Sequence, residues 1–197
     1  TITSGQMSQF LTLLEQKAMT PERFQKLLSA GILADLCDPN ANLDRSAVQK
    51  VLTTFPLTID YALTLEQMIA AGNYDWVNSD ITPTHFPVSG ESVQERIAEL
   101  VHLGRSISSQ DALAELERQG LRPATIEELL AFGATYPEKQ REFPIVALGS
   151  SCEMGGGRYV VCLGRDGTGR RLGLYWWDVG WRGLGRFLAF RKEHSGS

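Results

Sequence analysis

The chain has 197 residues, a mass of 21.8 kDa and a formal net charge of −4. Hydrophobic residues make up 43% and charged residues 21%, a composition that excludes a disordered chain and a coiled-coil rod. The apolar runs are too short to span a membrane, and no charged-then-apolar leader opens the sequence. We therefore expect a protein of the cytoplasm with no membrane partner.

Charge and glycine are unevenly distributed along the chain. Residues 1–140 carry 10 basic and 18 acidic side chains, whereas residues 141–197 carry 9 basic and 5 acidic ones. The stretch from Gly149 to Gly185 holds 11 of the 19 glycines. Three of the four tryptophans lie in the same stretch, at Trp176, Trp177 and Trp181. The last quarter of the chain is therefore expected to be built differently from the rest.

Residues 1–55 are predicted to form a helical segment. Thr20 followed by Pro21 is typical of an N-cap and the first position of a helix. Asp44 is predicted to cap a third helix, which Pro56 ends because proline cannot continue the hydrogen-bond ladder. The segment contains no cluster of polar residues that would indicate a site.

From Leu57 onward the pattern becomes mixed. Two stretches alternate as strands do, Leu57–Tyr61 and Ile97–Leu103. Helices are indicated by capping residues at their starts and glycine at their ends. Their expected ranges are Leu65–Ala71 after the Thr64/Gln67 capping box, Ser108 to Gly120, and Thr125 to Gly133.

The rest of the chain is predicted to be β-structure. Short strands separated by glycine-rich turns are expected at Pro144–Leu148, Tyr159–Leu163, Leu172–Trp177 and Arg186–Arg191. Because these strands follow the helices as a block, the order favours an α+β fold over a parallel α/β sheet.

One of these strands predicts an exposed binding face. By period two, Leu172, Leu174 and Trp176 should face the core, and Arg171, Gly173 and Tyr175 should face outward with Trp177. Trp177 remains open, because the following turn could fold its ring back onto the domain. A face used only for solubility would carry more Lys, Glu and Thr. Arg, Tyr and Gly are closer to the composition of a binding surface.

Catalytic and metal sites are only weakly indicated. His85 lies in a predicted loop and His102 on a predicted strand, so an enzyme would need the fold to bring a Cys or Ser to one of them. Cys152 and Cys162 have no neighbouring His and do not predict zinc. We expect no catalytic residue, no metal and no cofactor, with an enzyme built on His85 or His102 as a weaker alternative.

Several segments resemble a group of proteins from small-genome, candidate-phylum bacteria and their mobile elements. In that group a constant framework surrounds outward positions that differ widely. We identify the group with the variable proteins of diversity-generating retroelements, which display changing residues on a C-type-lectin-like fold. The likeness covers roughly residues 57–197. The segments that carry it are Tyr74–Asn78, Ile107–Ser109, Leu121–Thr125, Phe143–Ser150 and Arg186–Lys192.

The resemblance implies an α+β, C-type-lectin-like domain of two helices and short antiparallel strands at 56–197. It also implies a non-enzymatic, ligand-binding display protein with a variable surface at about 151–185. Such retroelements change template adenines, often at Asn codons, and the tryptophans cannot arise that way. The expected display positions can: Gly164, Arg165, Asp166, Arg171, Gly173, Tyr175, Gly180, Arg182, Gly183, Leu184 and Gly185. The calcium motif and disulfides of lectins are not present, which argues against calcium-dependent sugar binding.

An arginine cluster supports an alternative function. The C-terminal quarter could neutralise phosphates and stack bases, which would make the chain a nucleic-acid-binding protein or a protein that binds acidic partners. The acidic overall charge argues against nucleic acid. The leading expectation is a protein or other macromolecular ligand. The residues of the cluster are Arg158, Arg165, Arg170, Arg171 and Arg182, with Tyr175 and Trp177.

Overall fold

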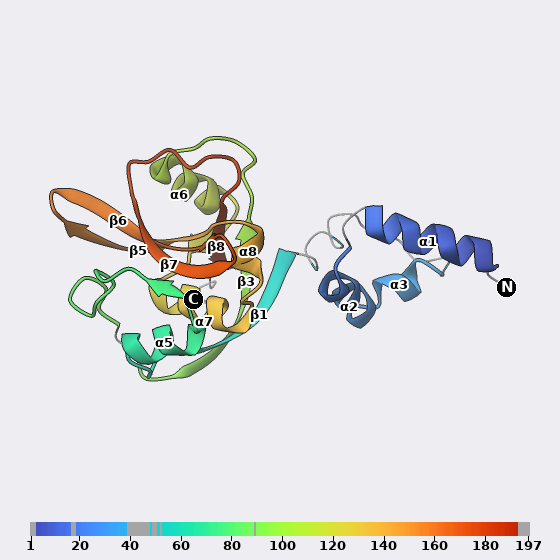
Figure 1. The fold of residues 1–197 in the computed structure, drawn as a ribbon, viewed down its shortest axis with the longest axis horizontal. Helices are drawn as coiled ribbons and strands as arrows, with labels where there is room; N and C mark the ends of the chain where they lie inside the picture. The colour runs from blue at the N-terminus through green and yellow to red at the C-terminus, as the bar shows by residue number, and fades with distance from the viewer. Residues whose placement is uncertain are drawn as a thin grey trace, which may run out of the picture. The chain divides into compact units, whose positions relative to one another are not determined.

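The computed structural model describes residues 3–16, 19–38, 48, 51, 53–88 and 90–192. The chain divides into two compact units, residues 1–54 and residues 55–197 (Figure 1). All of the expected display positions lie in the second unit.

The first unit is helical in its described parts. It contains α1 (Ser4–Gln16), α2 (Pro21–Ser29) and α3 (Ile32–Asp35). The Thr20 side chain accepts a hydrogen bond from the Arg23 backbone N–H at 3.2 Å, which confirms the predicted cap. Asp44, the predicted cap of the next helix, lies outside the described residues.

The second unit is built on a mostly antiparallel sheet, so the α+β class is confirmed. The strands run in the order β1-β3-β8-β5-β6-β7-β2, and β4 pairs with β8. Two pairings are parallel, β2 with β7 and β5 with β8. The bounds are β1 Thr54–Asp60, β2 Trp76–Val77, β3 Val93–Val101, β4 Leu121–Pro123, β5 Ile145–Met154, β6 Gly157–Asp166, β7 Gly169–Trp176 and β8 Arg186–Arg191.

Pro56 does not end a helix but lies inside β1. Because β1 is at the edge of the sheet, a residue without a backbone N–H is tolerated there. The Pro56 carbonyl accepts a hydrogen bond from the Tyr136 hydroxyl at 2.6 Å. Phe55, Leu57 and Ile59 point from the same strand into the core.

Helices cover both faces of the sheet. On one face lie α5 (Leu65–Gly72) and α7 (Ile126–Thr135), and on the other lies α6 (Ser109–Arg118), as Figure 1 shows. The short α8 (Lys139–Glu142) precedes β5. The predicted caps are present: Thr64 and Gln67 bond reciprocally, and Ser108 accepts from the Asp111 backbone N–H at 3.0 Å.

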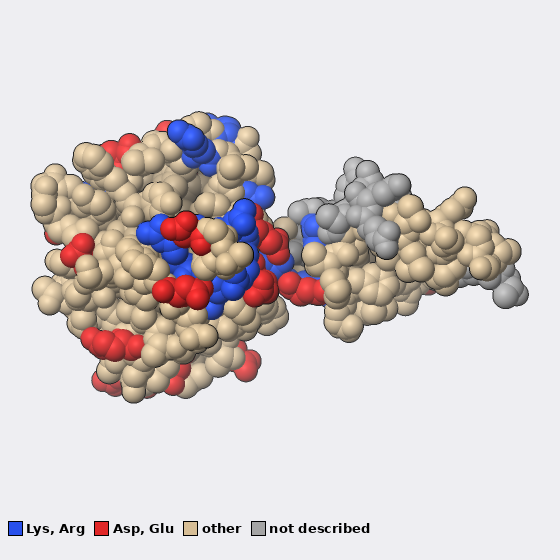
Figure 2. Space-filling model, viewed as in Figure 1, with Lys and Arg blue, Asp and Glu red and all other residues tan. Residues whose placement is uncertain are grey.

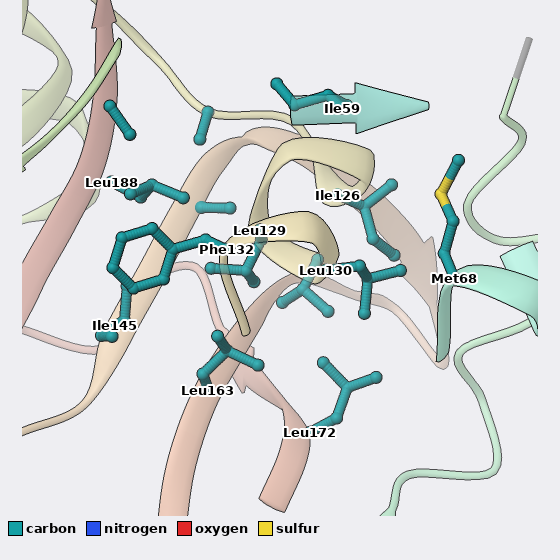
Figure 3. Packing of buried hydrophobic residues seen from close by; sticks show 14 of the residues in the cluster. Ile59, Met68, Ile126, Leu129, Leu130, Phe132, Ile145, Leu163, Leu172 and Leu188 are labelled. Carbon is teal, nitrogen blue, oxygen red and sulfur yellow. The ribbon is translucent and has the colours of Figure 1, made fainter. Parts of the chain in front are cut away.

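Each face has its own hydrophobic core. In the first core, α7 places Leu129, Leu130 and Phe132 against the sheet, among buried residues such as Leu163 and Leu172 (Figure 3). The second core lies under α6 and includes Leu116 and Cys162, together with two tryptophans of the segment that follows β7. The exposed side chains of β7 are therefore those that pack in neither core.

Helix α7 does not end at Gly133 as the sequence predicted. It continues to Thr135, and Gly133 is a buried contact position. A Cβ at Gly133 would lie 2.2 Å from the Tyr74 Oη atom, so only glycine leaves room for that ring. The glycine here reflects close packing and not a helix end.

The predicted burial of the two tryptophans at the end of β7 is reversed. Leu172 is buried and Leu174 packs against the first core, as expected, but Trp176 is 51% exposed and stacks on Tyr159. Trp177, predicted to face outward, is 7% exposed and belongs to the second core. The reason is that Trp177 keeps its place on the face of Gly173 and Tyr175, with its backbone N–H bonded to the Arg158 carbonyl at 2.7 Å, but α6 covers this end of the face.

Candidate ligand-binding surface

Strand pairing builds one face from three strands. Arg171 of β7 lies opposite Trp76 of β2 on one side and Gly164 of β6 on the other. Gly173 lies opposite Cys162. Because side chains alternate along a strand, Arg171, Gly173 and Tyr175 share this face, whereas Leu172 points to the opposite core. The sequence prediction of their common orientation is confirmed.

The face contains a shallow hollow with a volume of about 240 Å³. Two glycines form part of its floor. A Cβ on Gly164 would meet nothing within 4 Å, and one on Gly173 would meet only the Trp76 ring at 3.8 Å. The lining residues are Trp76, Asn78, Cys162, Gly164, Arg165, Arg171, Gly173, Leu174 and Tyr175.

Cations and aromatic rings form the walls of this hollow. The Arg171 guanidinium lies 4.1 Å from the centre of the Trp76 ring, and Tyr175 packs at 5.9 Å against the buried Trp181 ring. Arg171 also pairs with Asp166 at 3.4 Å, but both side chains are solvent-exposed, so the pair contributes little stability. Trp76 and Tyr175 remain 43% and 48% exposed. Rigid aromatic rings beside an arginine are typical of protein-binding hot spots.

Two further hollows adjoin the first. One, of about 350 Å³, is lined by Asp75, Trp76, Asp166, Gly169 and Arg171. The other, of about 320 Å³, is lined by His102, Gln140, Glu142, Phe143, Pro144, Arg165, Gly183, Leu184 and Arg186. Because Arg171 and Arg165 each line two hollows, the three form one surface, which we call the β7 surface.

Basic side chains gather on this part of the molecule. In Figure 2, Lys and Arg lie over β7 and α8 with acidic residues among them. Arg186 is held by the carbonyls of Leu184 and Gly185 and lies 4.6 Å from the Phe143 ring. Within the described part of the chain, the exposed Arg165 side chain forms no hydrogen bond or ion pair. Arg165 is therefore a cation that is available to a ligand.

Arg170 supports the surface from behind and is not part of it. Its side chain is 6% exposed and donates to the carbonyls of Gly72 and Gly133, at 2.5 and 2.6 Å, and to Gln140 Oε1 at 2.9 Å. It also lies 4.9 Å from the Tyr74 ring. Arg170 thereby joins β7 to α5, α7 and α8. Its predicted place in a phosphate-binding cluster is wrong, because the guanidinium is buried.

The segment between β7 and β8 is held in place by buried hydrogen bonds. The Ser109 hydroxyl donates to the Trp177 carbonyl at 2.6 Å and accepts from Trp181 Nε1 at 2.8 Å. Backbone bonds of 3.0 and 2.8 Å join Ile107 and Trp181. His102 Nε2 lies 2.6 Å from the Gly183 carbonyl oxygen. Trp181 therefore packs beneath the surface and supports the Tyr175 ring above it.

The structure brings eight of the eleven expected display residues to the β7 surface. Gly164, Arg165, Arg171, Gly173 and Tyr175 line the central hollow, and the side hollows add Asp166, Gly183 and Leu184. Gly180, Arg182 and Gly185 line none of the three.

Sequence reasoning missed several lining residues, among them Trp76 and Asn78 of the central hollow. They lie almost a hundred residues before β7 and reach it only through the parallel pairing of β2. An exposed aromatic residue in a short strand carries no sequence signal that separates it from a core residue.

Both described histidines contact backbone carbonyl groups. His85 Nδ1 lies 2.8 Å from the Asp80 carbonyl oxygen, and the His102 ring bonds the Gly183 backbone. Burial raises the pKa of the Cys162 thiol to about 12, so it stays protonated and unreactive at neutral pH. Among the described residues no group of three or more His, Cys, Asp or Glu side chains is placed to hold a metal ion.

Comparisons with known proteins add no relative. No family model, curated protein or solved structure matches this chain. Within the described residues, no helix has both the length and the apolar character that crossing a bilayer requires. The function must therefore be inferred from the β7 surface itself.

Proposed function

We propose that this chain is a ligand-binding protein that uses the β7 surface for recognition. We further propose that its second unit is a C-type-lectin-like domain diversified by a retroelement. Two helices and antiparallel strands in the expected order support the fold. An exposed arginine and partly exposed aromatic rings around a hollow support the binding role.

The observation that carries the proposal is the room around particular glycines. Gly164, Gly173, Gly180 and Gly185 could each accept a Cβ at an ordinary contact distance or in open space, and none has a positive φ. Residues at these positions can therefore change without disturbing either core. Gly183 is tighter, with a backbone atom at 3.2 Å.

Four glycines outside the expected display set could not accept a side chain without strain or a clash. Gly155, Gly156 and Gly167 have positive φ values, and a Cβ on Gly149 would lie 2.5 Å from the Ala124 carbonyl oxygen. These positions resist substitution for backbone or packing reasons. Four of the expected display glycines thus accept a side chain where these four glycines do not.

A genomic comparison tests the diversification. We expect a reverse-transcriptase gene nearby, with an imperfect repeat of the segment that encodes residues 158–191. Differences between the two copies should fall at adenines of the repeat and at the codons of the display positions. Differences spread evenly over all bases would overturn the retroelement proposal.

The free energy of unfolding of glycine variants tests whether the display positions tolerate side chains. We expect Gly164→Ser and Gly173→Ser to change the free energy of unfolding by less than about 0.5 kcal/mol, as exposed substitutions do. Gly149→Ala, the matched control at a position where a Cβ would meet backbone atoms, should cost about 1–3 kcal/mol through overpacking. Urea unfolding followed by tryptophan fluorescence measures both. Equal losses at all three positions would contradict tolerance at the surface.

Nucleic-acid binding is the second candidate function. Arg158, Arg165 and Arg182 remain exposed, and Trp176 offers a partly exposed ring. Binding of a fluorescent 20-nucleotide single strand between 50 and 200 mM salt separates the candidates. A steep loss of affinity with salt would favour nucleic acid. Our proposal expects no measurable binding at 200 mM salt.

A further inference from the structure

The dimensions of the β7 surface indicate what kind of ligand it takes. Its hollows measure about 240, 320 and 350 Å³, at or below the lower end of the range for small-molecule pockets, which runs from about 300 to 1,000 Å³. Separate shallow hollows of this size suit individual side chains of a protein partner. This inference rests on the proposed binding function of the same surface.

The central hollow is shaped for one large apolar side chain. Gly173 presents backbone, with the Trp76 ring close to the place of its missing Cβ. Tyr175 follows two residues along the same face, about 7 Å further on. A ring resting on Gly173 would therefore lie between two aromatic side chains, an arrangement that aromatic pairs favour.

The positive charge beside the central hollow favours an acidic residue next to the aromatic residue of the partner. Arg165 has no partner among the described side chains, and Arg171 has only the weak, exposed contact with Asp166. Strand alternation places Arg171 on the face of the central hollow, whereas Arg165 pairs with the buried Arg170 and faces the other way, so Arg171 is the cation of this hollow. A carboxylate is the natural ligand of such a group, because arginine can bind both of its oxygens.

We propose that the β7 surface binds a protein segment in which an aromatic residue lies next to an Asp or Glu. The aromatic ring sits on Gly173 between Trp76 and Tyr175, and the carboxylate pairs with Arg171. Trp76 lies outside the expected variable segment at about 151–185. It therefore supplies a constant aromatic wall even in copies whose display residues differ.

Selection of a random peptide library against the full chain tests this inference. We expect the enriched peptides to carry Trp, Tyr or Phe within two residues of Asp or Glu. Binding should fall at least tenfold when that acidic residue is replaced by its amide, and also in the Gly173→Val and Arg171→Met variants. Thr58→Val and Arg118→Met, the matched controls on exposed positions of β1 and α6, should change affinity less than twofold.

The other outcomes separate the inference from the proposed function. Peptides that lack the aromatic–acidic pair but lose binding in Gly173→Val would overturn the inference and leave the β7 surface as the binding site. Peptides that bind Gly173→Val and Arg171→Met as tightly as the original chain would overturn both. A library that yields no specific binder would overturn the inference. Circular dichroism of each variant confirms that a lost interaction does not reflect unfolding.

Discussion

At the scale of single residues, Arg170 is the side chain on which the β7 surface depends most. Its guanidinium has no carboxylate partner among its hydrogen bonds and is held by three backbone carbonyls, those of Gly72, Asn73 and Gly133, and by Gln140. Hydrogen bonds that involve a charged group are worth about 1.5–3 kcal/mol each. The buried Arg170 guanidinium therefore stabilises the fold by bonding carbonyls of α5 and α7, and it does not contact a ligand.

Replacing Arg170 should therefore be costly. We expect Arg170→Met to lower the free energy of unfolding by about 3 kcal/mol or more, because it leaves buried carbonyls without a donor. Arg165→Met, the exposed control one strand away, should change it by less than about 0.5 kcal/mol. Urea unfolding measures both, and equal effects would contradict the supporting role of Arg170.

Glu128 forms a second buried polar cluster, on the side of α7 near β1. It is 1% exposed and accepts from Arg122 at 2.6 and 2.9 Å and from the Tyr61 hydroxyl at 3.0 Å. Burial, followed by the nearby negative charge of Glu128, raises the pKa of Tyr61 to about 12. The ordinary value is 10.0.

This shift predicts a loss of stability in alkali. Below pH 10 both states keep the Tyr61 proton, so the folded state retains its full advantage. Between pH 10 and 12 the unfolded chain releases the proton while the folded chain holds it, so stability falls as pH rises. Thermal midpoints at pH 8 and pH 11 should differ less in Tyr61→Phe than in the original chain. An equal difference would show that Tyr61 does not contribute.

At the scale of elements, α5 and α7 are positioned by a ring between them. The Tyr74 side chain lies against Gly72 at the end of α5 and Gly133 within α7, and a Cβ at either glycine would lie 2.2 Å from it. The Tyr74 hydroxyl is buried and has no hydrogen-bond partner among the described residues. The Tyr74 ring therefore stabilises the fold by packing, whereas its buried, unpaired hydroxyl lowers the stability.

Two substitutions test this packing. We expect Gly133→Ala to cost about 1–3 kcal/mol by overpacking. Tyr74→Phe should be neutral or stabilising, because it removes a buried polar group without a partner. The double variant should lose less than Gly133→Ala alone, since the clashing oxygen is gone, and a double-mutant cycle measures this coupling. Strictly additive effects would contradict direct contact.

At the scale of the whole molecule, the two units differ in what they contribute. Every buried residue of the two sheet cores lies between Phe55 and Phe190, and every residue that lines the β7 surface lies between Asp75 and Arg186. The described part of residues 1–54 supplies none of them. Among the described residues, the second unit therefore supplies both of its own cores.

We accordingly expect residues 55–197 to fold without the first unit. The isolated fragment should retain the near-ultraviolet circular dichroism of its four tryptophans and a thermal midpoint within a few degrees of that of the full chain. Loss of the tryptophan signal on removal of residues 1–54 would show that the second unit depends on the first.

The sequence by itself determined the features that depend on local physics. Capping residues located the starts of α5, α6 and α7, and strand alternation placed Arg171, Gly173 and Tyr175 together, because caps and strand period are properties of a few adjacent residues. It also indicated the α+β class through the order of the elements.

Only the tertiary structure decided which side chains meet across long separations. It buried Arg170 and Trp177, exposed Trp176, and made Gly133 a contact for Tyr74 in place of a helix end. It also brought Trp76 beside Arg171. These outcomes depend on which strand pairs with which and on which helix covers each face. Burial is set by neighbours distant in the chain, so a local pattern cannot encode it.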